Sequence, residues 1–131
     1  MKYLIDTHMF IWFVENSPKL SSSIKNLIED ENSEIFISIA SLWEVSIKTS
    51  INKLQLNRKY EEISDVLSDN LIEILPIYFS HTVENNHLPF HHRDPFDRII
   101  IAQAIVEEID FISADAVFDD YLTSKSIKRI W

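Results

Sequence analysis

Short runs of consecutive apolar residues alternate along the chain with longer segments in which apolar residues recur every three or four positions. The first pattern is typical of buried strands, and the second is typical of helices that bury one face. Strands are predicted at 3–5, 35–37, 72–75, 111–112 and 127–130. Helices are predicted at 7–15, 39–54, 60–68, 78–86, 95–106 and 117–121. A further helix is predicted to begin at the serines 21–23 and to run to residue 28. This alternation predicts a single α/β domain over residues 1–131 with a mostly parallel central sheet.

The composition removes several classes of function, because the chain contains no Gly and no Cys. Average usage predicts roughly nine glycines in a protein of this length. Without Gly, neither a P-loop nor a dinucleotide-binding fingerprint can form, since both need close approach of the backbone to phosphate. The nucleophile elbow of an α/β-hydrolase also needs Gly. Without Cys, disulfides, thiolate metal sites and cysteine nucleophiles are excluded as well.

The charge balance limits the partners that the chain can bind unaided. Twelve Lys and Arg residues against 21 Asp and Glu residues give a net charge of −9. General nucleic-acid binding needs a basic surface, so a polyanionic substrate would require metal ions or a local basic rim. No apolar run approaches the roughly 18 residues that a membrane span needs. The first apolar run ends at Asp6, unlike a signal peptide, and we therefore expect a cytoplasmic protein with no membrane partner.

Five acids occupy positions where parallel sheets place functional sites. Asp6 and Asp115 each follow a predicted strand, and if those strands are neighbours the two carboxylates converge at one sheet edge. Asp94 and Asp97 stand at the cap and the third position of the helix at 95–106, where the helix dipole favours acids. Glu44 lies within a helix at the border of its apolar face, where an unpaired charge is costly.

Each of these acids also has a purely structural interpretation. Asp6, Asp94 and Asp115 could cap helices, and Glu44 could form an ion pair with Lys48 one turn later. A converging cluster is harder to explain structurally, because two carboxylates about 4 Å apart repel by roughly 4 kcal/mol at an effective dielectric near 20. Such a cluster persists if some acids are protonated or if a divalent cation binds. All-oxygen ligands favour Mg²⁺ or Mn²⁺ over zinc.

Other polar and aromatic residues give weaker signals. The five histidines include no pair spaced four apart on a helix, so a zinc site is disfavoured. Trp12, Trp43 and the Phe residues are expected in the core rather than on a surface that stacks against nucleic-acid bases. Arg93, Arg98, Lys48 and the pair at 58–59 could supply a local basic rim.

Three segments in this order resemble the PIN-domain family. They are 4–8 (LIDTH), 38–48 (SIASLWEVSIK) and 92–98 (HRDPFDR), followed by 112–115 (ISAD) with Val117 and Phe118. Their order and spacing are most similar to the VapC-like ribonuclease toxins of type II toxin–antitoxin pairs, and the resemblance covers essentially the whole chain. The complete absence of Gly is a departure from the family that does not touch these segments.

The resemblance implies a three-layer α/β/α sandwich and an endoribonuclease site that depends on Mg²⁺ or Mn²⁺. By position, Asp6, Glu44, Asp97 and Asp115 match the acidic quartet of the family, which binds the metal and carries catalysis. Ser113 and Thr7 match supporting positions behind the quartet, whereas Asp94 is interpreted as a helix cap. The family further implies a homodimer and a cognate antitoxin, with DNA contacted only through the antitoxin. The alternatives that we consider are a non-catalytic PIN fold used for binding and a small-molecule metal phosphohydrolase of α/β type.

Overall fold

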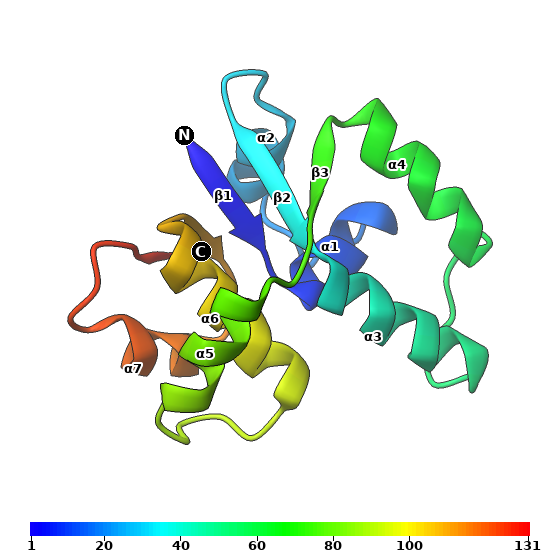
Figure 1. Ribbon diagram of the computed structural model, residues 1–131. Coiled ribbons are helices and arrows are strands. Elements are labelled where there is room, and N and C mark those ends of the chain that lie inside the picture. The colour runs from blue at the N-terminus through cyan, green and yellow to red at the C-terminus, as the bar shows by residue number, and fades with distance from the viewer.

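The computed structural model describes all residues 1–131 and places five strands in one sheet of order β3-β2-β1-β4-β5 (Figure 1). The strands are β1 Lys2–Ile5, β2 Glu34–Ser38, β3 Ile72–Leu75, β4 Asp110–Ile112 and β5 Arg129–Ile130. Every neighbouring pair runs parallel. All five predicted strands are therefore present, and the parallel α/β architecture expected from the sequence is confirmed.

Seven α-helices connect or flank these strands. They are α1 Thr7–Val14, α2 Ser22–Glu29, α3 Ile39–Ser50, α4 Ile63–Asp69, α5 Phe79–His87, α6 Pro95–Glu107 and α7 Asp119–Leu122. Two 3₁₀ turns, Tyr60–Glu62 and Ala116–Phe118, precede α4 and α7. The helix predicted at 39–54 stops at Ser50, and the one predicted at 60–68 begins as a 3₁₀ turn. No helix combines the length and the apolar character that crossing a membrane requires.

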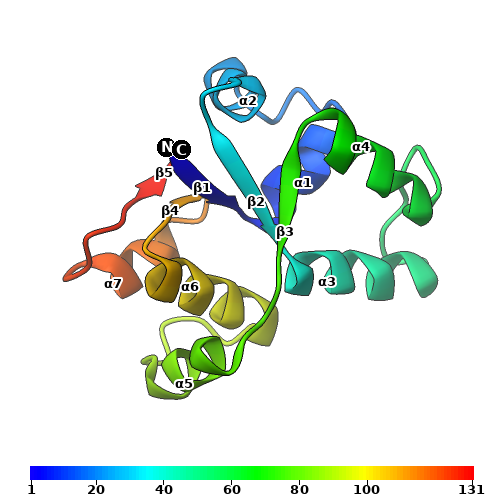
Figure 2. The same cartoon turned by 45° about the horizontal axis from the view of Figure 1, so that its top comes forward.

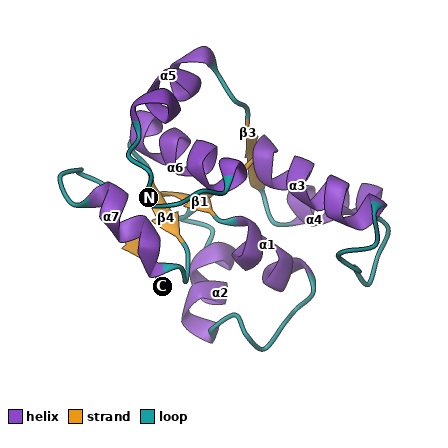
Figure 3. Ribbon diagram, turned by 90° about the horizontal axis from the view of Figure 1, so that it is seen from below, coloured by secondary structure: helices purple, strands orange, loops and turns teal.

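The sheet separates two layers of helices, as the view from below in Figure 3 shows. Helices α1 and α2 lie on one side of the strands, and α5 and α6 lie on the other (Figures 2 and 3). Successive side chains of a strand point to opposite faces, so Tyr3 and Ile5 enter the first core whereas Leu4 enters the second. This arrangement is the α/β/α sandwich that the sequence led us to expect.

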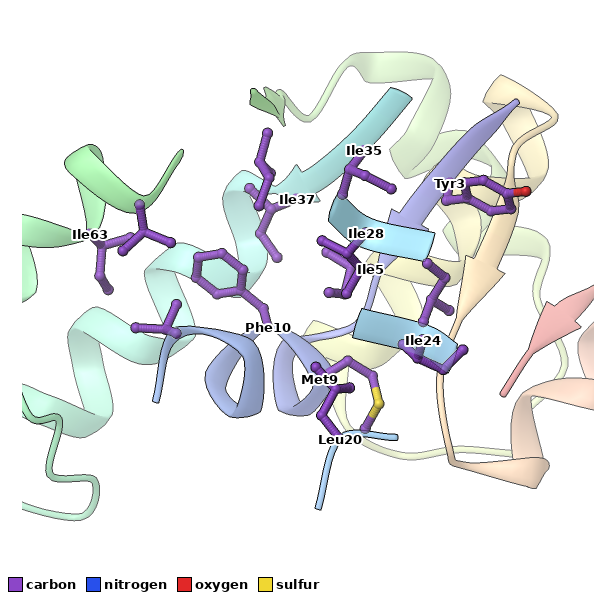
Figure 4. Packing of buried hydrophobic residues seen from close by; sticks show 14 of the residues in the cluster. Tyr3, Ile5, Met9, Phe10, Leu20, Ile24, Ile28, Ile35, Ile37 and Ile63 are labelled. Atoms are coloured by element: carbon purple, nitrogen blue, oxygen red, sulfur yellow. The ribbon is translucent and has the colours of Figure 1, made fainter. Parts of the chain in front are cut away.

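Each face of the sheet has its own apolar core. In the first, Met9 and Phe10 of α1 and Ile24 and Ile28 of α2 pack against strand side chains such as Ile37 (Figure 4). The second core is built mainly by α6, β4 and α7. Its buried residues include Ile100, Ile101, Ala102, Phe111, Phe118, Tyr121 and Leu122. These two cores fix the strand ends and the first turns of α1 and α6 relative to one another.

Not every aromatic residue enters a core, and this corrects the expectation from the sequence. Phe10, Phe111 and Phe118 are buried. In contrast, Trp43 is 61% exposed, Phe79 is 83% exposed and Phe90 is 82% exposed. The patterns at 39–54 and 78–86 identify helices but do not show which side of each helix another element covers.

The lack of Gly leaves residues with side chains in left-handed backbone conformations. Asn16 and Asn52 have φ values of 51° and 58°, which Asn tolerates comparatively well. Leu71 and Glu108 both have φ of 54°, where a Cβ atom crowds the following carbonyl oxygen. Glu108 ends α6 in this conformation, a position at which Gly is the usual residue.

Candidate active site

The carboxyl ends of β1 and β4 lie side by side and carry the first two predicted site residues. Ile5 pairs with Ile112, and the Asp6 N–H donates to the Ile112 carbonyl at 3.0 Å. Asp6 then caps α1, since its Oδ1 accepts from the Met9 N–H at 2.9 Å. The condition set by the sequence is met: the two strands are neighbours, so Asp6 and the segment leading to Asp115 leave the sheet at the same edge.

Ser113 connects these two acids directly. Its hydroxyl donates to Asp6 Oδ2 at 2.5 Å, and its Oγ accepts from the Asp115 N–H at 3.0 Å. The Ser113 side chain is fully buried, and its carbonyl accepts from Arg129 Nη1 at 2.9 Å. A single hydroxyl therefore fixes the orientation of the Asp6 carboxylate and the start of the turn that presents Asp115.

The first turn of α6 contributes Asp97 to the same region. Asp94 caps this helix, with Oδ1 accepting from the Phe96 N–H at 2.8 Å, as the sequence predicts. His92 Nε2 lies 3.0 Å from Asp97 Oδ2 and 3.6 Å from Asp115 Oδ2. Since His92 Nδ1 accepts from the Asp94 N–H at 3.2 Å, the ring carries its proton on Nε2, facing the two carboxylates. His92 thus lies between acids from α6 and from the segment after β4.

Glu44 comes from α3, the helix that directly follows β2, and β2 is the neighbour of β1 in the sheet. Lys48 donates to its Oε2 at 2.7 Å, so the ion pair considered at the sequence level is present. The side chain of Glu44 is only 6% exposed, and its other oxygen, Oε1, is buried without any hydrogen-bond partner. One half of this carboxylate is therefore left available for a further positive ligand.

Burial and neighbouring charge disfavour the ionised forms of Asp97 and Asp6. Burial raises the pKa of Asp97 to about 7, and the negative charges of Asp94, Glu44, Asp6 and Asp115 add to this effect in that order. Burial also raises the pKa of Asp6, opposed by its hydrogen bonds from the Met9 N–H and Ser113. Asp97 therefore lies within electrostatic range of each of the other three quartet acids.

Thr7, the remaining predicted residue, does not contact the acids through its side chain. Its hydroxyl donates to Ser41 Oγ at 2.8 Å, and both residues are buried. The bond ties α1, which begins after Asp6, to α3, which carries Glu44. Any support that Thr7 gives to the site is exerted through this link between the helices.

Comparison with known proteins agrees with this arrangement. The family model described as the PIN domain matches residues 3–121. The chain belongs to the PIN domain family. No curated protein matches this PIN domain by sequence.

Solved structures reproduce the PIN fold over nearly the full chain. A chain in the crystal structure of VapBC2 from Rickettsia felis bound to a promoter DNA fragment matches with a TM-score of 0.73, 17% identity, and coverage of 99% of this chain and 98% of that one. DNA-bound VapBC from Salmonella typhimurium gives a TM-score of 0.70, 15% identity, and 99% and 97% coverage. FitAcB from Neisseria gonorrhoeae gives a TM-score of 0.69 and 15% identity, with coverage of 98% of this chain and 96% of that one. At these identities the likeness establishes the fold.

The PIN-domain acids suit a hard divalent cation by their chemistry. As the side chains stand, no three His, Asp or Glu residues form a ready-made metal cluster. Lys48 and His92 lie against the acids instead. The unpartnered Glu44 Oε1, the raised pKa of Asp97 and the purely carboxylate donor set all fit an added positive charge of the Mg²⁺ type.

His92 is the functional-site residue of this PIN domain that the sequence did not single out. The histidines were considered only as zinc ligands, for which their spacing is wrong. His92 stands two residues before the Asp94 cap, in the loop that leads into α6. Tyr121 holds it there, because the His92 N–H donates to the Tyr121 hydroxyl at 2.7 Å and the His92 ring stacks on Phe118.

Proposed function

We propose that this PIN domain is a metal-dependent endoribonuclease that hydrolyses RNA phosphodiester bonds. The observation that carries the proposal is geometric: Ser113 links Asp6 to the turn of Asp115, and the His92 ring lies between Asp97 and Asp115. Acids that approach one another repel, and a bound divalent cation removes this cost without protonation of the carboxylates. The family resemblance of the segments that carry them supports RNA as the polymer that is cut.

The quartet would hold Mg²⁺ or Mn²⁺, with Asp6, Asp97 and Asp115 as the main ligands and Glu44 completing the set directly or through water. The ion supplies Lewis-acid polarisation of a phosphodiester and activation of water at neutral pH. The chain itself supplies orientation: Ser113 fixes the Asp6 carboxylate, and His92 holds Asp97 and Asp115 on one side of the space. Lys48 keeps one oxygen of Glu44 paired.

The biological setting that fits best is the toxin of a type II toxin–antitoxin pair in the cytoplasm. The structural neighbours include VapBC and FitAcB assemblies, and some of those contain DNA. A net charge of −9 suits a basic antitoxin segment that blocks the acidic site. DNA would then be contacted through the antitoxin rather than by this acidic chain.

A homodimer is the assembly that we propose for the toxin. Four apolar residues spaced four apart along α3 form an exposed stripe: Ile39, Trp43, Ile47 and Ile51. Contiguous exposed apolar surface of this kind marks protein interfaces. Sedimentation velocity of the wild type and of Ile47→Glu tests this assignment. We expect a dimer that dissociates in the variant, whereas a monomeric wild type contradicts it.

The test of catalysis compares the wild type with Asp6→Asn on total cellular RNA. We expect Mg²⁺-dependent cleavage by the wild type that EDTA abolishes, and no cleavage by a variant whose circular dichroism is unchanged. Asn keeps an oxygen that can cap α1, which is why folding should survive. Equal cleavage by Asp6→Asn would remove Asp6 from the site. RNA that is bound but never cut in Mg²⁺ or Mn²⁺ would instead identify a non-catalytic binding module.

A further inference from the structure

Phe90 is an exposed aromatic residue in the loop between α5 and α6. The residue is 82% exposed, although apolar side chains of this size usually find cover. The residue stands two positions before His92, whose ring contacts Asp97 and Asp115. Two residues span at most about 7 Å of backbone, so the loop carries Phe90 close to His92.

Arg98 makes this loop rigid. The buried guanidinium donates to four carbonyls: Pro89 at 2.8 Å, Leu88 at 3.2 Å, Asn85 at 3.3 Å and His92 at 3.4 Å. Charge-assisted hydrogen bonds are roughly twice as strong as neutral ones. The backbone on both sides of Phe90 is therefore held by a single side chain from the residue after Asp97.

The same guanidinium also supports the ring. The Arg98 Cζ atom lies over the Phe90 ring, 4.1 Å from its centroid. This is a cation–π contact, and it covers one face of the ring with the Arg98 guanidinium. Backbone carbonyls hold that guanidinium in place, and it forms no ion pair with a carboxylate. With one face occupied and 82% of the residue exposed, the opposite face is open to solvent.

The surroundings of Phe90 differ in charge from the rest of the chain. Residues 85–93 read NNHLPFHHR and contain no Asp or Glu, whereas the whole chain carries 21 acids. His91 and Arg93, one and three residues after Phe90, are both exposed, and the His91 ring lies edge-on to Tyr121. An exposed aromatic ring with a cation such as Arg93 nearby in the chain is a combination that single-stranded nucleic-acid sites use, with stacking for the base and positive groups for the backbone.

We propose that the open face of Phe90 stacks against an unpaired nucleobase of the RNA that enters the acidic site. The inference rests on the ribonuclease function proposed above and specifies its substrate as locally single-stranded. Stacking on a phenyl ring tolerates any base, because each base has a π face. Phe90 then positions the strand next to the acids, and Arg93 is placed to meet its phosphates.

The experiment measures binding of a fluorescein-labelled 12-nucleotide single-stranded RNA of random sequence, by anisotropy in Mg²⁺. All proteins carry Asp6→Asn, so that the RNA remains intact. Phe90→Leu removes the ring and keeps an apolar side chain, whereas Phe90→Trp restores an aromatic face. Phe79→Leu is the matched control, because Phe79 is equally exposed, at 83%, and lies at the opposite end of α5 from this loop. Circular dichroism verifies that each variant is folded.

We expect Phe90→Leu to weaken RNA binding by about 5- to 150-fold, the range for loss of one stacked base. Phe90→Trp and Phe79→Leu should bind as the parent does. Equal binding by Phe90→Leu overturns the inference and leaves the nuclease proposal standing if the wild type still cuts RNA. Failure of both binding and cleavage overturns both proposals. A change in oligomeric state with unchanged RNA binding would assign Phe90 to a protein interface instead.

Discussion

Replacing Asp97 by Asn should stabilise the protein in the absence of divalent ions. Asn has nearly the shape of a protonated Asp, and its oxygen can still accept from His92 Nε2, which lies 3.0 Å from Asp97 Oδ2. The substitution therefore removes the negative charge and keeps the contact. The charge matters because burial and the neighbouring acids raise the pKa of Asp97 from 3.8 to about 7.

The size of the effect follows from this difference in pKa. One pKa unit corresponds to about 1.4 kcal/mol, so ionised Asp97 destabilises the folded state by at most about 4 kcal/mol. The side chain is 23% exposed, and solvent screening reduces the expected value to about 2 kcal/mol. Because the folded pKa lies above the unfolded one, the stability contributed by the proton is full below about pH 3.8 and is lost as the pH rises through about 7.

Urea unfolding in EDTA at pH 5, 6, 7 and 8 measures this effect. The stability advantage of Asp97→Asn over the wild type should grow from pH 5 to pH 7 and then level off near pH 8. An advantage of about 2 kcal/mol shifts the urea midpoint by about 1 M. Asp69→Asn is the control, since this exposed acid at the end of α4 lies across the sheet from the site and should change stability by less than about 0.5 kcal/mol.

The reasoning is refuted if Asp97→Asn is less stable than the wild type at pH 8. It is equally refuted if the difference between the two proteins is the same at every pH. Either result would mean that burial and the neighbouring acids do not raise the pKa of Asp97 in the folded protein.

Three further perturbations test other parts of the structure. Mg²⁺ should raise the melting temperature of the wild type more at pH 8 than at pH 6, because bound carboxylates must be deprotonated, and an equal shift contradicts this. Arg98→Met should lower the free energy of unfolding, measured in urea, by about 3 kcal/mol, because it leaves carbonyls such as Leu88 O without a donor. A loss under about 1 kcal/mol would show that water hydrogen-bonds these carbonyls in the variant. Leu71→Asn should raise the free energy of unfolding by about 0.5–1 kcal/mol, because Leu71 has φ of 54° and is 80% exposed. Unchanged stability in calorimetry would show that the Leu71 backbone is unstrained.

The sequence was sufficient for the fold because its local and long-range signals agree. The run ending at Ile5 is a strand, the next residue caps a helix, and Pro95 marks the start of α6. Since Asp6 and Asp115 each follow a strand, the parallel pairing of those strands was enough to bring them together. The predicted convergence thus depended only on backbone topology.

Side-chain contacts between distant segments could not be predicted in the same way. His92 meets Asp97 and Asp115 because Tyr121, 29 residues away, receives its N–H. Phe90 lies outside the core with its ring against Arg98, whose guanidinium donates hydrogen bonds to the loop carbonyls. Neither fact has a periodicity or a spacing that the sequence displays.

The most direct test of the central claim is Mn²⁺ binding measured by isothermal titration calorimetry. Four separate variants, Asp6→Asn, Glu44→Gln, Asp97→Asn and Asp115→Asn, are compared with the wild type. If the four acids face one cation-binding space, the wild type binds Mn²⁺ and every variant loses affinity or stoichiometry. Wild-type affinity retained in all four variants, or no binding by the wild type, would contradict the account.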